Sequence, residues 1–218
     1  MRVLLLTDIH GHHGKLEKII NREKFDAILC AGDLGDAKEF DDYEVNLGHV
    51  LDAMDQTGKM AKAVPGNMDK EEVCVRKLIE RRMNIHKKIA SFEKFEAVGF
   101  GGGKTPFDTF FEPDGSDIRN AISTLHGRMK ADKKVAVIHQ PPFDTRLDTI
   151  ENEHVGSEEV RELIEETDFD LVLTGHIHEA RGVDELGSTR LVNPGPVVDG
   201  FYGVADVDEG FEIELKQL

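Results

Sequence analysis

Short apolar runs recur along the chain and alternate with segments in which the apolar residues have helical spacing. The runs lie at residues 3–6, 27–30, 62–64, 135–138 and 171–173, and their length and composition predict buried strands. Helical spacing follows the first run at Leu16, Ile19 and Ile20. It returns at Val160, Leu163 and Ile164, with Ser157 as the expected N-cap. Alternation of this kind predicts an α/β fold with a largely parallel sheet.

The C-terminal third has a different pattern. Residues 190–192, 202–207 and 211–215 read as consecutive strands, separated by turn sequences at 193–195 and 208–210. These strands predict an antiparallel or mixed region. Two long connections, at 101–113 and 139–156, are expected to be functional or mobile because loops of that length are uncommon in compact domains. No repeat or linker divides the chain, so residues 1–218 are expected to form a single domain.

Charge and composition narrow the classes of partner. The 218 residues include 43 acidic and 27 basic side chains, a formal net charge of −16. This balance argues against binding long nucleic acids or anionic membranes, which depend on lysine and arginine. The first apolar run is too short for a signal peptide or a membrane span. The two cysteines, Cys30 and Cys74, are expected to be free and buried. We therefore expect a cytoplasmic protein.

Polar side chains follow five of the predicted strands. Because ligands bind beyond the carboxyl ends of strands in open α/β sheets, we expect these side chains to converge. They are Asp8, His10, Asp33, Asn67, His139, His176 and His178.

This set has the chemistry of a metal centre. Carboxylate, amide and imidazole groups suit borderline divalent ions such as Mn, Fe, Ni or Zn. Seven ligands are too many for one tetrahedral ion, whereas two ions about 3.5–4 Å apart that share a carboxylate fit the number. Each motif is weak by itself, since a polar residue after a strand is usually a turn or cap residue. The ordered set of five is the informative signal.

The same motifs resemble those of a known family. Asp8-x-His10, Gly32-Asp33, Gly66-Asn67-x-Asp69, His139 and Gly175-His176-x-His178 are similar to the five motifs of the calcineurin-like metallophosphoesterases. The resemblance extends from residue 1 to about 207 and is strongest to the small archaeal and bacterial phosphoesterases related to the Icc cyclic-nucleotide phosphodiesterase. It implies a four-layer αββα sandwich of two mixed β-sheets flanked by helices.

The resemblance also implies roles for the seven residues. One metal ion is expected at Asp8, His10, Asp33 and His178, and a second at Asp33, Asn67, His139 and His176, with Asp33 as the bridge. The implied activity is hydrolysis of a small phosphoester by a metal-activated hydroxide, with Asp33, Asn67 and His176 as catalytic residues. Monoester, diester and cyclic nucleotide substrates all remain open at this stage, as does a homo-oligomeric state.

One position departs from the family pattern. The motif Gly-Asn-His-Asp reads Gly66-Asn67-Met68-Asp69 here, and a thioether cannot protonate a leaving group. His12, His13 and His154 are candidates for a replacement proton donor, although each is more simply a solvated loop histidine. The departure also leaves open an alternative function, a metal-binding scaffold or protein-interaction module with weak or no catalysis.

Several other features receive structural interpretations. Residues 101–105 resemble a phosphate-binding loop, but Val98 stands where a Walker A motif needs glycine, and Pro106 follows in place of a helix. The phenylalanines at 107, 110 and 111 are expected to cover the core, with a specificity pocket at Phe107 and Phe110 as the alternative. The histidines at 49, 86 and 126 have no partner pattern and are expected to be ordinary surface or half-buried residues.

Overall fold

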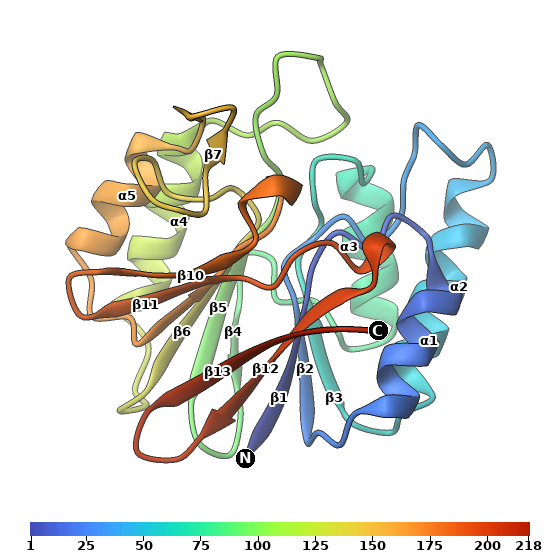
Figure 1. Ribbon diagram of the computed structural model, residues 1–218, viewed down its shortest axis with the longest axis horizontal. Helices are drawn as coiled ribbons and strands as arrows, with labels where there is room; N and C mark the ends of the chain where they lie inside the picture. The colour runs from blue at the N-terminus through green and yellow to red at the C-terminus, as the bar shows by residue number, and fades with distance from the viewer.

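Two mixed β-sheets pack face to face in the computed structural model, which describes all residues from Met1 to Leu218 (Figure 1). The first sheet has the strand order β13-β12-β1-β2-β3. β1, β2 and β3 run parallel, while β12 and β13 add antiparallel pairs beside β1. The bounds of these strands are β1 Arg2–Leu6, β2 Ala27–Cys30, β3 Met60–Ala63, β12 Phe201–Val207 and β13 Phe211–Gln217.

The second sheet has the order β10-β11-β9-β6-β5-β4. Its four inner strands are parallel, and β4 and β10 pair antiparallel at the two edges. The bounds are β4 Ile89–Ser91, β5 Glu96–Phe100, β6 Lys134–Ile138, β9 Leu171–Leu173, β10 Gly182–Leu186 and β11 Thr189–Asn193.

Helices cover the outer face of each sheet. Figure 1 shows α1, α2 and α3 on the first sheet and α4 and α5 on the second. Their bounds are α1 His13–Arg22, α2 Tyr43–Asp55, α3 Glu71–Glu80, α4 Gly115–His126 and α5 Glu158–Glu165. Short 3-10 helices lie at η1 (His178–Ala180) and η2 (Val197–Asp199). None of these helices has the length and apolar character needed to cross a membrane.

Three buried apolar clusters fill the spaces between the four layers. A cluster of 22 residues lies between the first sheet and α1–α3, and one of 16 residues lies between the two sheets. A third cluster, of 15 residues, lies between the second sheet and α4 and α5. Strand β1 shows the cause: Leu4 and Leu6 face the helices, while Val3 and Leu5 face the other sheet. A strand buried on both faces must be apolar at every position, as the sequence pattern shows. The expected αββα sandwich is confirmed.

Local expectations are met in part. Ser157 caps α5, since its Oγ accepts a hydrogen bond from the Val160 amide at 3.2 Å. Residues 101–113 form an irregular loop, whereas the 139–156 connection contains a small hairpin of β7 (Thr149–Ile150) and β8 (Glu153–His154). Cys30 and Cys74 are free and buried, as expected.

Two expectations about aromatic and histidine side chains are wrong. Phe111 is buried, but Phe107 and Phe110 are 79% and 47% exposed and do not cover the core. Their loop rises above the edge of the sheets (Figure 1), so both side chains remain in contact with solvent. His86 is only 5% exposed, because it packs against the rings of Phe100 and Phe111.

Candidate metal centre

All seven predicted ligands lie at one edge of the sandwich, where the parallel strands of both sheets end. The first sheet supplies Asp8 and His10 after β1, Asp33 after β2 and Asn67 after β3. The second supplies His139 after β6, and His176 and His178 after β9. Strands from the two sheets therefore bring together side chains that are far apart in sequence and place them within hydrogen-bonding range.

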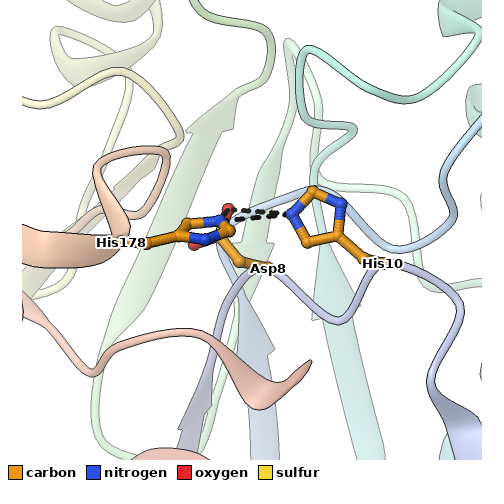
Figure 2. Close-up of side chains that lie close together, drawn as sticks. All are labelled: Asp8, His10 and His178. Atoms are coloured by element: carbon orange, nitrogen blue, oxygen red, sulfur yellow. Dashed lines mark hydrogen bonds and ion pairs between the residues drawn. The ribbon is translucent and has the colours of Figure 1, made fainter. Parts of the chain in front are cut away.

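Asp8, His10 and His178 form the first group, shown in Figure 2. Oδ1 of Asp8 lies 3.5 Å from Nε2 of His178 and 3.9 Å from Nε2 of His10. The two Nε2 atoms are 3.2 Å apart. Because both imidazole nitrogens and a carboxylate oxygen point to the same space, one cation fits between them.

The remaining four residues form a neighbouring group. Oδ1 of Asn67 lies 2.9 Å from Nε2 of His139 and 2.8 Å from Nδ1 of His176. Oδ2 of Asp33 lies 3.4 Å from Nε2 of His139 and 3.7 Å from Nε2 of His10. Asp33 therefore stands between the two groups. Asp8 also lies close to Asp33 and His139, so both carboxylates are central to the arrangement.

Three of the histidines are oriented by a hydrogen-bond acceptor at the ring nitrogen that faces away from the centre of the site. Nδ1 of His10 lies 3.0 Å from the Asp36 carboxylate, Nδ1 of His139 lies 2.6 Å from the Ala31 carbonyl, and Nε2 of His176 lies 3.0 Å from the Lys104 carbonyl. An acceptor at the outer nitrogen favours a proton there and leaves the inner nitrogen free to bind a metal ion. Asp36 was not among the residues predicted from the sequence, because its contact with His10 depends on how the two loops fold.

Four of the seven residues have left-handed backbone conformations. Asp8, His10, Asp33 and His176 have φ values of 52°, 45°, 49° and 71°. Non-glycine residues rarely adopt this region, and such strain concentrates at functional sites, where the surrounding structure maintains it. Its occurrence at four predicted ligands is independent support for a functional site.

Two glycines permit the close approach of the strands. A side chain at Gly66 would collide with the backbone and carboxylate of Asp33, and one at Gly175 would collide with Thr7 and Asp8. Both glycines directly precede a predicted ligand. They are required because the loops after β3 and β9 pass within contact distance of the loops after β2 and β1.

Asp69 organises the loops around the site without pointing into it. Its buried carboxylate accepts hydrogen bonds from the amides of Leu34, Gly35 and Gly66 at 3.0, 2.9 and 2.8 Å, and from the Tyr43 hydroxyl at 2.8 Å. Burial and repulsion from Asp33 raise the pKa of Asp69 to about 6. The loops that carry Asp33 and Asn67 are thereby joined.

The charge of the site suits cations. Asp8 and Asp33 are almost completely buried, and their ion-pair partners are histidines, with no lysine or arginine among them. Burial opposes a charge on His10 and His139, yet the surrounding carboxylates outweigh it and raise the pKa of each to about 9. Burial lowers the pKa of His176 to about 4. Buried carboxylates that are surrounded by imidazoles and have no lysine or arginine partner fit bound metal ions.

The three candidate proton donors lie outside this constellation. Nε2 of His12 is 3.9 Å from Glu39, the His13 ring lies against His49, and Nδ1 of His154 is 2.7 Å from Asp148. None of them hydrogen-bonds to a predicted ligand. Met68 contributes its main chain, since its amide donates to Oδ1 of Asp33 at 2.7 Å.

Comparison with known proteins establishes the family. The model of the calcineurin-like phosphoesterases matches residues 1–180. The chain is 32% identical over 204 residues to an uncharacterized protein of Methanocaldococcus jannaschii, covering 90% of this chain and 88% of that protein. The chain therefore belongs to the calcineurin-like phosphoesterase family.

Two solved structures share the fold. The protein TT1561 of Thermus thermophilus superimposes with a TM-score of 0.80 at 19% identity, covering 99% of this chain and 98% of that chain. A dimetal phosphatase from Danio rerio superimposes with a TM-score of 0.71 at 12% identity, covering 100% and 98% of the two chains. At these identities the likeness extends to the fold alone.

Proposed function

We propose that the chain is a dinuclear-metal phosphoester hydrolase that acts on small phosphoesters. The observation that carries the proposal is the convergence of seven side chains of metal-binding types from two sheets, four of them with left-handed backbone conformations. The family comparison supports phosphoester chemistry, and the Danio rerio protein of the same fold is a dimetal phosphatase.

The donor sets fit two ions. Asp8, His10, Asp33 and His178 would hold the first, and Asp33, Asn67, His139 and His176 the second, with Asp33 in both sets. Two divalent cations bound by these residues would supply a nucleophilic water at neutral pH and would neutralise charge on the phosphoryl oxygens. Mn, Ni, Fe and Zn all suit this mixture of oxygen and imidazole donors.

The protein's own contribution is preorganisation. Asp36 and the carbonyls of Ala31 and Lys104 fix three imidazole rings, and Asp69 fixes the loops that bear Asp33 and Asn67. Cys30 does not serve as a nucleophile, because burial and nearby carboxylates raise the pKa of its thiol. Cys30 is therefore not expected to form a covalent intermediate with the substrate.

Met68 determines which substrates react well. A thioether provides no proton for the leaving oxygen, and general acid catalysis typically contributes about 10²–10⁴-fold. We infer that the chain prefers esters with good leaving groups. The same residue supports a second candidate function, a metal-binding scaffold with weak catalysis.

The proposal is tested by metal analysis and a phosphoester panel. Protein loaded with Mn²⁺ or Ni²⁺ is expected to hydrolyse p-nitrophenyl phosphate or bis-p-nitrophenyl phosphate. Asp33→Asn is expected to lower the rate by at least about 100-fold, since even residues behind metal ligands contribute about 10–100-fold. Asp208→Asn is the matched control, because Asp208 lies 90% exposed at the turn after β12, at the opposite end of the sandwich. An unchanged rate in Asp33→Asn would refute the proposal.

A Met68→His variant separates the two candidate functions. If the chain is an enzyme that lacks its acid, this variant gains rate on alkyl phosphoesters and gains little on nitrophenyl esters. If neither the natural chain nor the variant hydrolyses any member of the panel, the scaffold function is preferred.

A further inference from the structure

The loop at 101–113 is attached directly to two of the predicted ligands. The Lys104 carbonyl lies 3.0 Å from Nε2 of His176. At the other side of the loop, Nδ2 of Asn67 donates to Oγ1 of Thr109 at 3.3 Å, and the amides of Phe110 and Phe111 donate to the Asn67 carbonyl at 3.0 and 3.1 Å. Both ends of the loop are therefore anchored to the second group of ligands.

A carboxylate braces the loop from within. Oε1 of Glu112 accepts from Oγ1 of Thr105 at 2.8 Å and from the amide and Oγ1 of Thr109 at 2.7 and 2.6 Å. Burial disfavours the charged carboxylate, but the threonine donors outweigh it and lower the pKa of Glu112. The Phe107 amide donates in turn to Oγ1 of Thr105 at 3.2 Å. Figure 1 shows the loop between β5 and α4, raised above the edge of the sheets.

Phe107 is presented at the tip of this braced loop. Its side chain is 79% exposed, more than any other large hydrophobic side chain in the molecule. Its neighbours have other roles: Phe111 is buried beside His86, and the Phe110 ring lies 5.9 Å from Nζ of Lys70. Phe107 forms no comparable aromatic or cation contact. Folding does not account for this aromatic ring, whose loop is held in place by polar bonds.

The main chain of Phe107 lies near the candidate metal centre. Phe107 is three residues from Lys104 and two from Thr109, so its Cα lies within about 11 Å of the main-chain contact with His176. A ring that extends from a phosphoester oxygen and the Phe107 side chain can meet across such a distance. Offset or edge-to-face contact between two aromatic rings is favourable beyond the burial of their area.

We propose that Phe107 is a specificity-determining residue that contacts an aromatic group on the substrate, so that the site selects aryl-bearing phosphoesters over alkyl ones. The inference rests on the proposed function, since it requires a phosphoryl group at the metal centre. It does not require turnover, and binding of non-hydrolysable phosphonates therefore tests it separately.

The first measurement is calorimetric. Metal-loaded protein is titrated with phenylphosphonate and with methylphosphonate, and the ratio of their dissociation constants is compared between variants. Phe107→Ala is expected to lower the preference for phenylphosphonate by about fivefold, the contribution of one aromatic pair. Met60→Ala is the matched control, because Met60 is 47% exposed at the start of β3, at the opposite end of the sheet. It is expected to leave the ratio unchanged.

The second measurement uses the absence of tryptophan from the chain. In Phe107→Trp the new indole is the sole tryptophan, and its emission is expected to change on addition of phenylphosphonate and to stay constant with methylphosphonate. Met60→Trp is expected to respond to neither.

The outcomes separate this inference from the proposed function. Equal binding of the two phosphonates, or a ratio unaffected by Phe107→Ala, overturns the role of Phe107 even if the protein hydrolyses phosphoesters. A Phe107-dependent ratio in a protein without hydrolytic activity supports the aromatic contact and refutes the hydrolase. If neither phosphonate binds the metal-loaded protein, both proposals fail.

Discussion

His86 shows how one buried side chain controls a functional loop. Its Nδ1 accepts a hydrogen bond from the Gly101 amide at 2.9 Å, which fixes the first residue of the 101–113 loop. Burial, together with the positive charge of Lys87, lowers the pKa of His86 to about 3. Oε1 of Glu71 lies 3.4 Å from Nε2, but this partly exposed carboxylate does not offset the cost of burial. His86 is therefore neutral in the folded protein at pH 7.

The depressed pKa predicts a specific acid sensitivity. The pKa of His86 is near 6.5 in the unfolded chain and lower in the folded protein. Between about pH 6.5 and pH 3, therefore, His86 binds a proton in the unfolded state and remains neutral in the folded state. The stability contribution is fully present above pH 6.5 and decreases below it, by about 2 kcal/mol at pH 5. His86→Gln, which keeps an acceptor for Gly101, is expected to remove this decrease. Urea unfolding of metal-free protein at about pH 7 and about pH 5 measures it. Equal pH sensitivity in the two proteins would contradict the assignment.

At the scale of elements, the 139–156 connection is organised around one buried carboxylate. Asp148 is fully buried and accepts from the amides of Asp144, Thr145 and Gly156 at 3.2, 3.0 and 2.9 Å. His154 of β8 donates to the same carboxylate at 2.7 Å. This network explains why a long loop with only two short strands has a defined shape.

Asp148→Asn is expected to loosen this connection. In asparagine an NH2 group replaces one carboxylate oxygen, so this donor would face the main-chain amides that donate to Asp148. The hydrogen bonds lost are to a charged acceptor, and such bonds contribute about 1.5–3 kcal/mol each. We expect a loss of about 2 kcal/mol in unfolding free energy and faster hydrogen exchange at residues 144–156. Glu151→Gln is the control, because Glu151 is exposed in the turn between β7 and β8. Unchanged exchange in Asp148→Asn would show that the strands alone define the loop.

At the scale of the whole molecule, the candidate metal centre joins the two sheets. Asp8, His10, Asp33 and Asn67 extend from the first sheet, and the other three histidines from the second. The residues that cross between the sheets at this edge are mostly acids and imidazoles, whereas the middle of the interface is apolar. Ions bound here would therefore stabilise the packing of one sheet on the other.

Removal of metal is expected to lower the melting temperature. A ligand that binds only the folded state stabilises it by about 2.7 kcal/mol at one hundred times its dissociation constant. For a chain of this size that corresponds to a shift of about 5–10 °C. Scanning calorimetry with Mn²⁺ and with excess chelator measures the shift, and Asp33→Asn is expected to show little of it. An equal melting temperature after verified removal of metal would mean that the centre contributes nothing to stability.

Most of the buried strands, and the sheet edge at which the predicted ligands gather, could be read from the hydrophobic pattern without the structure, whereas the four-layer arrangement was implied by the family resemblance. Strands buried on both faces must be continuously apolar, so β1, β2, β6 and β9 are visible as runs, and the polar residue that follows each run marks the same edge of a sheet. Three strands of the two large sheets were not predicted. The edge strands β4 and β10 are half-exposed and lack such runs, and the apolar run of the buried strand β5 is short and interrupted by Gly99.

The surroundings of those ligands, in contrast, depend on how the chain folds. The pairing of Asp36 with His10, the burial of His86 and the exposure of Phe107 depend on neighbours that are distant in sequence or on a loop that rises from the core. A hydrophobic pattern indicates which residue types prefer burial. It does not indicate whether another helix, strand or loop packs over a given side chain. For that reason the sequence could predict Phe107 either as a core residue or as part of a specificity pocket, and only the fold shows that its ring is exposed.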